Sequence, residues 1–312
     1  METKVYSNDV DHYRAPSYSH ATAFWIVVNK QITISILLGI VVLLSLVGNI
    51  LVVVASVLYV RLRSLMSIFI LNLALSDLLF TVGMLFWICD YIWHLDLGDT
   101  VCKMYRFFFS VGCYSNVVFQ VLMSFQRYMA VVHPRTGWKK GQSVKDVLIC
   151  AWVMSILAAL PVTVHFKTYP YLEGCTYSSD TAFAASMYKG IFVFLCSFLF
   201  MAFCYIRILQ NIKSTTNQEH KTTGLAFTLS ATYFVFWGPY SIVTFMTIFS
   251  DYHQMRFFTE NWTDKFYSRL SLILSLTRCC HNPLIYGLFI SKFSKTTREI
   301  FQRRATPNPL GI

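Results

Sequence analysis

A polar, helix-breaking and aromatic run, Asn282-Pro283-Leu284-Ile285-Tyr286, ends the last long apolar stretch of the chain. Such residues are costly in lipid, so function is the best reason for their presence there. Proline removes one backbone hydrogen bond and bends its helix, and the freed carbonyl needs a partner such as the Asn282 amide, a neighbouring helix or water. The run therefore predicts a movable hinge lined with polar groups.

Polar side chains also lie inside the other apolar stretches. Asp77 lies in the second stretch, and a carboxylate at mid-membrane must be paired or protonated. Asn49 in the first stretch and Asn116 in the third fall at depths comparable with that of Asn282. Each asparagine alone is equally well explained as an interhelical hydrogen bond. Together with the acid, they predict one polar cluster.

Arg278 lies four residues before Asn282 and therefore on the same face of a helix. A guanidinium stays charged, and leaving it unpaired in mid-membrane would cost roughly 2.5 to 3.5 kcal/mol. We expect Arg278 to pair with Asp77. The alternative is that Arg278 points into a water-filled cavity open to the outer side.

The composition identifies a membrane protein, because 55% of the residues are hydrophobic and only 13% are charged. A membrane-spanning helix needs about twenty predominantly apolar residues. The expected spans cover about 32–58, 66–92, 99–133, 145–166, 185–212, 219–249 and 266–288. The predicted fold class is thus an all-α bundle of seven transmembrane helices, whose first span acts as its own insertion signal.

The distribution of lysines and arginines among the loops predicts how the chain is oriented in the membrane. The loops after the first, third and fifth spans and the segment after the seventh carry most of the lysines and arginines, so this side is cytoplasmic and the N-terminus lies outside. The net charge of +11 therefore resides inside, where it fits anionic membrane lipids and a cytoplasmic partner. Nothing else in the sequence supports a nucleic-acid partner. We expect a multi-pass protein of the plasma membrane.

The cysteines support this orientation. Of nine, only Cys102 and Cys175 are predicted to lie outside, and they should form a disulfide because that compartment is oxidising. Asn261-Trp262-Thr263 is an acceptor sequence for glycosylation in the last outer loop. The sequence contains no metal-ligand spacing and no catalytic constellation, so we expect no metal, no cofactor and no enzymatic activity.

Several short motifs recur in order along the spans. They are Gly48-Asn49, Leu73 to Asp77, Cys102, Arg127-Tyr128, Trp152, Cys175, Trp237-Gly238-Pro239 and Asn282 to Tyr286. Individually, Arg127 at a membrane edge and a tryptophan beside a proline have ordinary structural explanations. As an ordered set, they resemble the rhodopsin-like class of G-protein-coupled receptors over residues from about 35 to 304.

Other residues narrow the resemblance. Phe109 and Leu276 stand where amine receptors and opsins of that class carry an Asp and a Lys, which disfavours both ligand types. The stretch from Ile68 to Asp77, the aromatic residues around Trp87 and the Cys279-Cys280 pair resemble chemokine receptors, nearest to the receptors for XC (lymphotactin-type) chemokines. That resemblance implies a small basic protein ligand and a heterotrimeric G protein of the inhibitory class. In many relatives the polar cluster binds a sodium ion, whose place Arg278 would occupy.

The resemblance also assigns roles to residues. The ligand's tip would enter a cavity lined by Trp87, Asp90, Tyr91, Phe109, Tyr188 and Tyr240. The activation switch would comprise Trp237, Pro239, Asn282, Pro283, Tyr286 and Tyr205. The G protein would meet Gln126, Arg127, Tyr128 and Pro134. The N-terminus, with Tyr6, Tyr13 and Tyr18 near acidic residues, would grip the body of the ligand.

The expected layout is an extracellular N-terminus (1–31), the seven-transmembrane domain (32–288), an amphipathic inner helix, helix 8 (289–304), and a short cytoplasmic tail (305–312). Several departures from the family leave alternatives open. Leu272 replaces a glutamate that meets the ligand in many relatives, so that contact is not carried over. Gln126 replaces the Asp that holds the arginine, Ser197 replaces a proline, and the tail is short. A scavenging receptor, or a constitutively active one of cellular or viral origin, therefore remains an alternative. A transporter or channel is disfavoured because no internal repeat or second broken helix is present.

Overall fold

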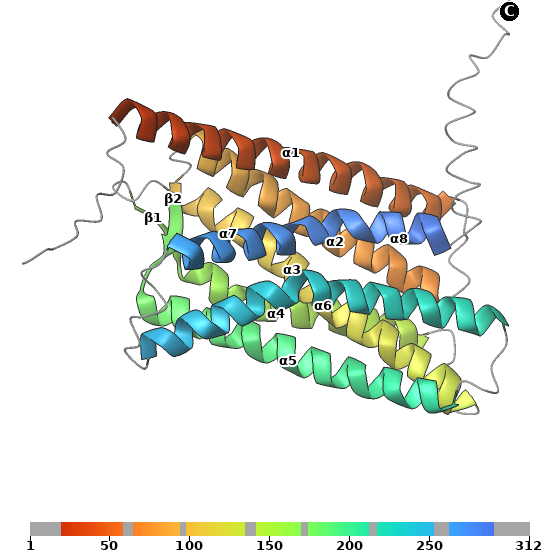
Figure 1. Ribbon diagram of the computed structural model, residues 1–312. Coiled ribbons are helices and arrows are strands. Elements are labelled where there is room, and N and C mark those ends of the chain that lie inside the picture. The colour runs from red at the N-terminus through yellow and green to blue at the C-terminus, as the bar shows by residue number, and fades with distance from the viewer. Residues whose placement is uncertain are drawn as a thin grey trace, which may run out of the picture.

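Long apolar runs become helices in this chain because only a helix satisfies every backbone N–H and C=O without water. The computed structural model describes residues 20–58, 65–93, 98–134, 142–169, 174–211, 217–252 and 262–289. Its long helices lie side by side as one bundle (Figure 1). They are α1 (His20–Leu58), α2 (Leu65–Trp93), α3 (Gly98–Val132), α4 (Gln142–Val164), α5 (Asp180–Asn211) and α6 (Asn217–Tyr252). The predicted helical bundle is confirmed.

The seventh predicted span is a helix of three consecutive parts. They are α7 (Trp262–Thr277), the single 3-10 turn η3 (Arg278–Cys280) and α8 (His281–Phe289). The label α8 thus denotes the last turns of this span, whereas the amphipathic inner helix predicted over 289–304 lies outside the described residues, apart from Phe289. Six helices, α1 to α6, are long and apolar enough to cross a membrane by themselves. The 3-10 turn ends one residue before Asn282-Pro283, so the irregular backbone lies next to the segment where the sequence predicted a hinge.

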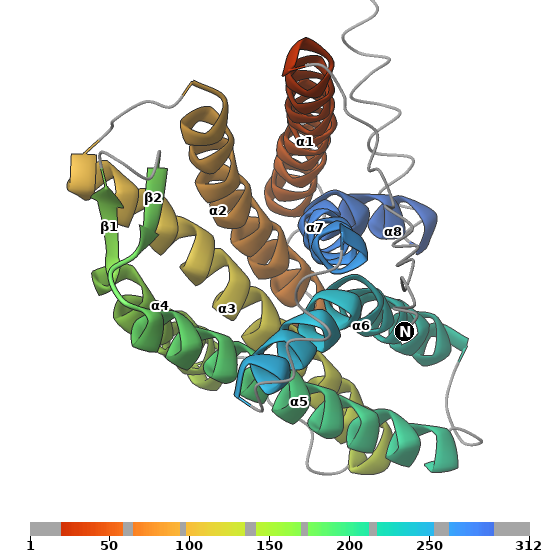
Figure 2. The ribbon, with the colours of Figure 1, turned by 60° about the vertical axis from the view of Figure 1, so that its left-hand side comes forward.

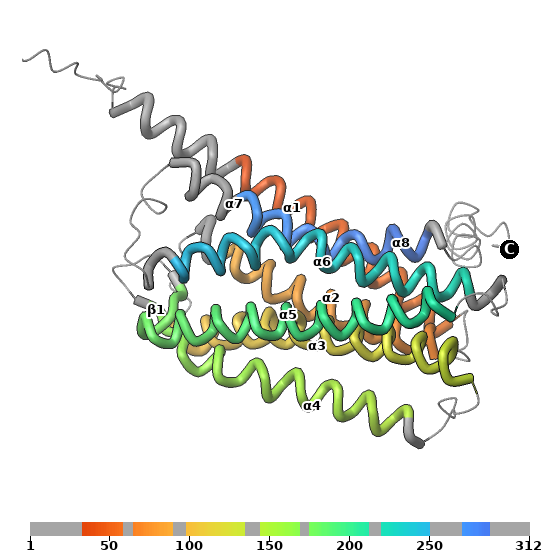
Figure 3. Tube along the Cα trace, turned by 60° about the horizontal axis from the view of Figure 1, so that its bottom comes forward, coloured from red at the N-terminus to blue at the C-terminus, as the bar shows by residue number. Residues whose placement is uncertain are grey.

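The position of α3 explains how the bundle is organised. This helix contacts α2, α4, α5, α6 and the outer hairpin, so it lies among the other helices rather than at their edge (Figures 2 and 3). Its buried face carries polar residues such as Ser115, Asn116 and Gln120, whereas the outward faces of α1 and α5 expose Leu43, at 63%, and Phe192, at 67%. Polar groups inside and apolar groups outside are the pattern that lipid favours.

A two-stranded hairpin, which the sequence did not predict, follows α4. Strand β1 (Phe166–Tyr169) pairs antiparallel with β2 (Gly174–Tyr177), and Phe166 is opposite Tyr177. The disulfide between Cys102 and Cys175 ties β2 to the first turn of α3. Asp99 Oδ1 accepts hydrogen bonds from the backbone N–H and the hydroxyl of Thr168, at 2.8 and 2.6 Å. The hairpin is therefore fixed to the outer end of α3.

Helices α2 and α3 approach each other closely at two glycines. A Cβ on Gly83 would lie 2.5 Å from the backbone nitrogen of Phe109, and a Cβ on Gly112 would collide with the backbone of Phe80. The rings of Phe80 and Phe109 lie between these glycines, with centroids 4.6 Å apart. Small residues at a membrane helix contact allow this approach, which brings Asp77 and Asn116 within hydrogen-bonding distance.

Replacing Gly112 by alanine is therefore expected to destabilise the receptor by about 1–3 kcal/mol, because the obstructing atoms belong to the backbone and cannot rotate away. Thermal denaturation of the purified receptor in detergent, followed by circular dichroism, measures the effect. Gly39→Ala is the matched control, because a Cβ on Gly39 meets no atom within 4 Å. Equal melting temperatures for the two variants would contradict the close approach.

Candidate functional site

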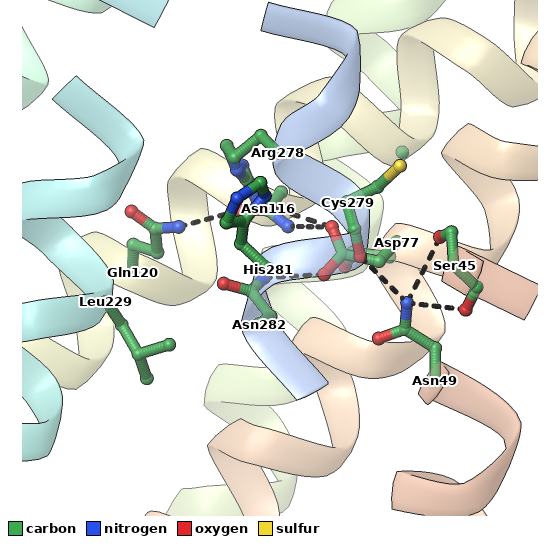
Figure 4. Close-up of polar contacts among 12 residues, drawn as sticks. Ser45, Asn49, Asp77, Asn116, Gln120, Leu229, Arg278, Cys279, His281 and Asn282 are labelled. Carbon is green, nitrogen blue, oxygen red and sulfur yellow. Dashed lines mark hydrogen bonds and ion pairs between the residues drawn. The ribbon is translucent and has the colours of Figure 1, made fainter. Parts of the chain in front are cut away.

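The carboxylate of Asp77 lies at the centre of a polar cluster formed by side chains of several helices (Figure 4). Its Oδ1 accepts hydrogen bonds from Asn116 Nδ2 on α3, at 2.7 Å, and from Arg278 on η3, at 3.2 Å. Its Oδ2 accepts a hydrogen bond of 2.5 Å from Asn282 Nδ2 on α8. Gln120 Nε2 extends the cluster by donating to Asn116 Oδ1 at 2.9 Å. The structure therefore brings together the residues that the sequence placed in one cluster.

The predicted ion pair between Arg278 and Asp77 is present, at 3.2 Å, and its two side chains are only 6% and 3% exposed. The guanidinium also lies over the ring of Tyr233 on α6, with the carbon Cζ 5.4 Å from the ring centroid. Burial is expensive for each charge alone and tolerable for the pair with its additional hydrogen bonds. The pair therefore links α2, η3 and α6.

Asn49 forms a second branch of the cluster from α1. Its Nδ2 donates to the carbonyl of Ser45 at 2.9 Å and to the carbonyl of Cys279 at 3.0 Å, which ties α1 to η3. The neighbouring Gly48 permits this contact, because a Cβ there would lie 2.8 Å from Cγ of Pro283. The Gly48-Asn49 motif thus holds α1 against the Asn-Pro segment, both by its small size and by an amide donor.

A cavity of about 190 Å³ opens beside the cluster, between α3, α5, α6 and the hairpin. Its wall includes Phe109, Trp237 and Tyr240, and the rings of Trp237 and Tyr240 lie edge to face, 5.9 Å apart. Asp77 and Arg278 also line this cavity. A group that enters it would therefore be close to the buried ion pair.

Two of the expected cavity residues are placed elsewhere. Tyr188 does not line the cavity, because its position on α5 turns it outward and leaves it 53% exposed, whereas the neighbouring Met187 faces inward. Trp87 packs instead between the apolar cluster around Met84 on α2 and the residues beneath the hairpin. Asp90, Tyr91 and the glycosylation residue Asn261 lie outside the residues whose side chains are described.

The hairpin covers the cavity with aromatic residues and contacts a cation. The guanidinium of Arg106 on α3 lies over the ring of Phe166, with Cζ 4.4 Å from the centroid. The rings of Phe166 and Tyr177 are 4.1 Å apart, and the Tyr177 hydroxyl donates to Ser186 Oγ at 2.9 Å. Burial raises the pKa of Tyr177, although its hydrogen bond with Ser186 and the charge of Arg106 oppose this shift. Tyr177 therefore remains a neutral donor.

At the inner end of the bundle, Arg127 donates hydrogen bonds to one side chain of α3 and to one of α6. Its Nε donates to Gln126 Oε1 at 2.7 Å, and its Nη1 donates to the hydroxyl of Thr222 on α6 at 2.9 Å. The Tyr128 hydroxyl lies 3.2 Å from His133 Nε2, and Pro134 is exposed in the turn after α3. Arg127 therefore connects α3 to α6 through Thr222.

The two tyrosines expected to act in activation are both buried and far from solvent in this arrangement. The hydroxyl of Tyr205 on α5 lies 3.1 Å from Ser124 Oγ and 3.1 Å from Ser230 Oγ, which joins α5, α3 and α6. Tyr286 on α8 is fully buried in the inner apolar cluster, and its hydroxyl contacts no hydrogen-bond partner among the described residues. Pro239 lies inside α6, which continues past it without a break.

Comparison with known proteins agrees with this geometry. Residues 48–286 match the family described as "7 transmembrane receptor (rhodopsin family)". The crystal structure of squid rhodopsin shares the fold, with a TM-score of 0.72 at 19% identity over 89% of this chain and 87% of that chain. The chain therefore belongs to the rhodopsin family of seven-transmembrane, G-protein-coupled receptors, which are not enzymes.

Curated relatives place the chain within this family. It is 34% identical to human chemokine XC receptor 1 over 89% of this chain and 85% of that protein, and 33% identical to the mouse receptor of the same name over 88% and 84%. It is 31% identical to human C-C chemokine receptor type 1 over 97% of this chain and 90% of that protein. The chain is thus a member of the chemokine receptor branch and a multi-pass protein of the plasma membrane.

Sequence reasoning missed several residues of the site, although a signal for some was present. Ser45 lies four residues before Asn49, Thr81 four after Asp77 and Gln120 four after Asn116, and residues four apart share a helix face. The hydroxyls of Ser45 and Thr81 are 2.6 Å apart. Arg106 follows Cys102 by four residues, so the predicted disulfide indicated which face of α3 the outer loop covers. No comparable signal indicated Thr222.

Replacing Arg278 by methionine is expected to lower the stability of the receptor by about 3–5 kcal/mol, because Asp77 would remain buried without its cation. Adding Asp77→Asn should recover much of this loss. Thermal denaturation of the purified single and double variants measures both effects. Arg207→Met, which removes an exposed arginine from α5, is the control and should change stability little. A double variant no more stable than Arg278→Met would show that the pair does not act as a unit.

Proposed function

We propose that this receptor binds a small basic protein of the chemokine type on its outer side and activates an intracellular G protein of the inhibitory class. The N-terminus lies outside, so residues 1–31, which precede the described side chains, supply the first contact with the ligand. The ligand's tip then enters the cavity beneath the hairpin. Similarity to receptors named for XC and C-C chemokines over most of the chain supports the ligand class.

One observation carries the signalling part of the proposal. The same cavity is lined by Phe166 and Tyr177 of the outer hairpin and by Trp237, Asp77 and Arg278 within the bundle. A ligand in contact with the first two residues therefore reaches the pair that links α2 and α6. Binding that favours one arrangement of this pair over another shifts the population of the helix packing.

The response would end at the inner face, where Arg127 joins α3 to α6 through Thr222. Movement of α6 separates these residues and frees Arg127, Tyr128 and Pro134 for the G protein. The guanidinium of Arg127 binds the neutral amide of Gln126 less strongly than it would bind a carboxylate. We therefore expect Gln126→Asp to lower the basal activity.

Guanine-nucleotide exchange on an inhibitory G protein, measured in membranes that contain this chain, tests the function. An XC-type chemokine is expected to raise the exchange rate, and Arg127→Gln should abolish the rise. Membranes without the receptor are the control, and binding of the labelled chemokine is measured in parallel. Binding without any change in exchange would contradict signalling and identify a scavenging receptor. A high rate that the chemokine does not alter would indicate constitutive activity.

Arg278 should also make ligand binding insensitive to sodium, because its guanidinium already neutralises Asp77 at 3.2 Å. The affinity for the chemokine is expected to be the same in sodium chloride and in choline chloride at equal ionic strength, which excludes general salt screening. Arg278→Asn, which opens the carboxylate to an external cation, should introduce a difference between the two salts. An affinity that depends on sodium in the natural chain would show that Arg278 does not take the place of the ion.

A further inference from the structure

The charge of the cavity is opposite to what a basic ligand would require. Asp77 is the one acidic residue among those lining it in the described part of the chain, and its two oxygens are already bound by Asn116, Arg278 and Asn282. Two arginines, Arg106 and Arg278, line the same cavity. After Asp77 has neutralised Arg278, one positive charge remains, on Arg106.

The guanidinium of Arg106 has an N–H donor with no hydrogen-bond acceptor among the described residues. No described carboxylate lies within ion-pair distance of it, and its Nε–H is buried without a hydrogen-bond partner. Its contacts are with aromatic faces, since Cζ lies 4.4 Å from the centroid of Phe166 and 5.7 Å from that of Tyr105. Such contacts stabilise the cation but leave the edge of the guanidinium, which carries its N–H donors, unoccupied. A buried donor without a partner is costly, and an entering acceptor would remove that cost.

The surroundings hold Arg106 in a fixed place. Cys102, one turn earlier on α3, is bonded to Cys175 of the hairpin, and Phe166 and Tyr105 are only 1% and 2% exposed. The Tyr177 hydroxyl and Ser186 lie on the same wall of the cavity as neutral polar groups. A planar guanidinium that is held in place and surrounded by low-polarity rings is suited to a carboxylate, which it can bind by two parallel hydrogen bonds.

We propose that the cavity is a carboxylate-binding site in which Arg106 is the anchor. This inference rests on the proposed function only in that the carboxylate belongs to the segment of the protein ligand that enters the cavity. Recognition is thus divided: the basic body of the ligand is bound outside, and an acidic group at its tip is bound inside.

Three probes of equal size test the site without knowledge of the ligand. Phenylbutanoate, phenylbutanamide and phenylbutylamine share one ring and one chain length and differ only in the charge and hydrogen bonding of the end group. Their dissociation constants for the purified full-length receptor follow from the rise in its melting temperature at constant ionic strength. The carboxylate is expected to bind about tenfold or more tightly than the amide, and the amine more weakly than either.

In the Arg106→Gln variant, phenylbutanoate and phenylbutanamide should bind with about equal dissociation constants. Lys103→Gln is the matched control, because it removes the same charge one turn away on α3 from a residue that does not line the cavity, and it should retain the preference. If Arg106→Gln does not fold, Arg106→Lys should show a smaller preference than the natural chain. Equal binding of carboxylate and amide by the natural receptor would overturn the proposal. A preference that survives in Arg106→Gln would also overturn it, and would place the anion at Arg278.

A second comparison identifies the source of the carboxylate. Acidic side chains in the N-terminal segment of an XC-type chemokine are converted to amides, and potency is measured by guanine-nucleotide exchange. If the protein ligand supplies the group, potency falls on the natural receptor but not on Arg106→Gln. Unchanged potency, with the preference for phenylbutanoate intact, assigns the site to a separate small carboxylate. If no chemokine raises exchange and the preference persists, the proposed function fails and the carboxylate site stands.

Discussion

A carboxylate cannot remain charged and unpaired among membrane-spanning helices, and the arrangement of this receptor follows from how Asp77 is satisfied. Its oxygens accept from α3, η3 and α8, and the same cluster reaches α1 through Asn49 and the carbonyl of Cys279. Each donor comes from a different element. The Asp77 carboxylate is therefore fully hydrogen-bonded only when these helices pack at the correct relative heights and rotations. The glycine contacts between α2 and α3 and between α1 and Pro283 allow the backbones to come close enough.

The cavity shares its inner wall with this cluster and its outer wall with the hairpin. One disulfide and two hydrogen bonds from Thr168 fix the hairpin to α3, so the aromatic cover and Arg106 are held in a constant relation. Arg106 at the outer end of the cavity thus contacts aromatic rings and no carboxylate among the described residues, whereas Asp77 and Arg278 at the inner end balance each other.

Hydroxyl and amide groups contribute many of the contacts between helices at the inner end of the bundle. Tyr205, Ser124 and Ser230 join three helices within 3.2 Å contacts, and Arg127 is bound by Gln126 and Thr222. Neutral hydrogen bonds contribute little net stability each, because water or another neutral group can replace them. An inner face held in this way is suited to a small difference in free energy between resting and active packing.

The sequence alone determined which residues are embedded in lipid, because apolar length and loop charge are local properties of the chain. It gave the helices to within several residues at most ends, the disulfide and the members of the Asp77 cluster, since a buried charge demands partners wherever it lies. It did not reveal the hairpin, because strands of four residues each are stable only when they pack on α3. It also did not reveal that the side chain of Tyr188 points outward whereas that of Met187 points into the cavity. Tertiary structure decided that Arg106 lines the cavity with no acidic partner among the described residues, and that Thr222 meets Arg127. Such contacts join residues distant in the chain, and the helix rotations that create them are set by packing of the whole bundle.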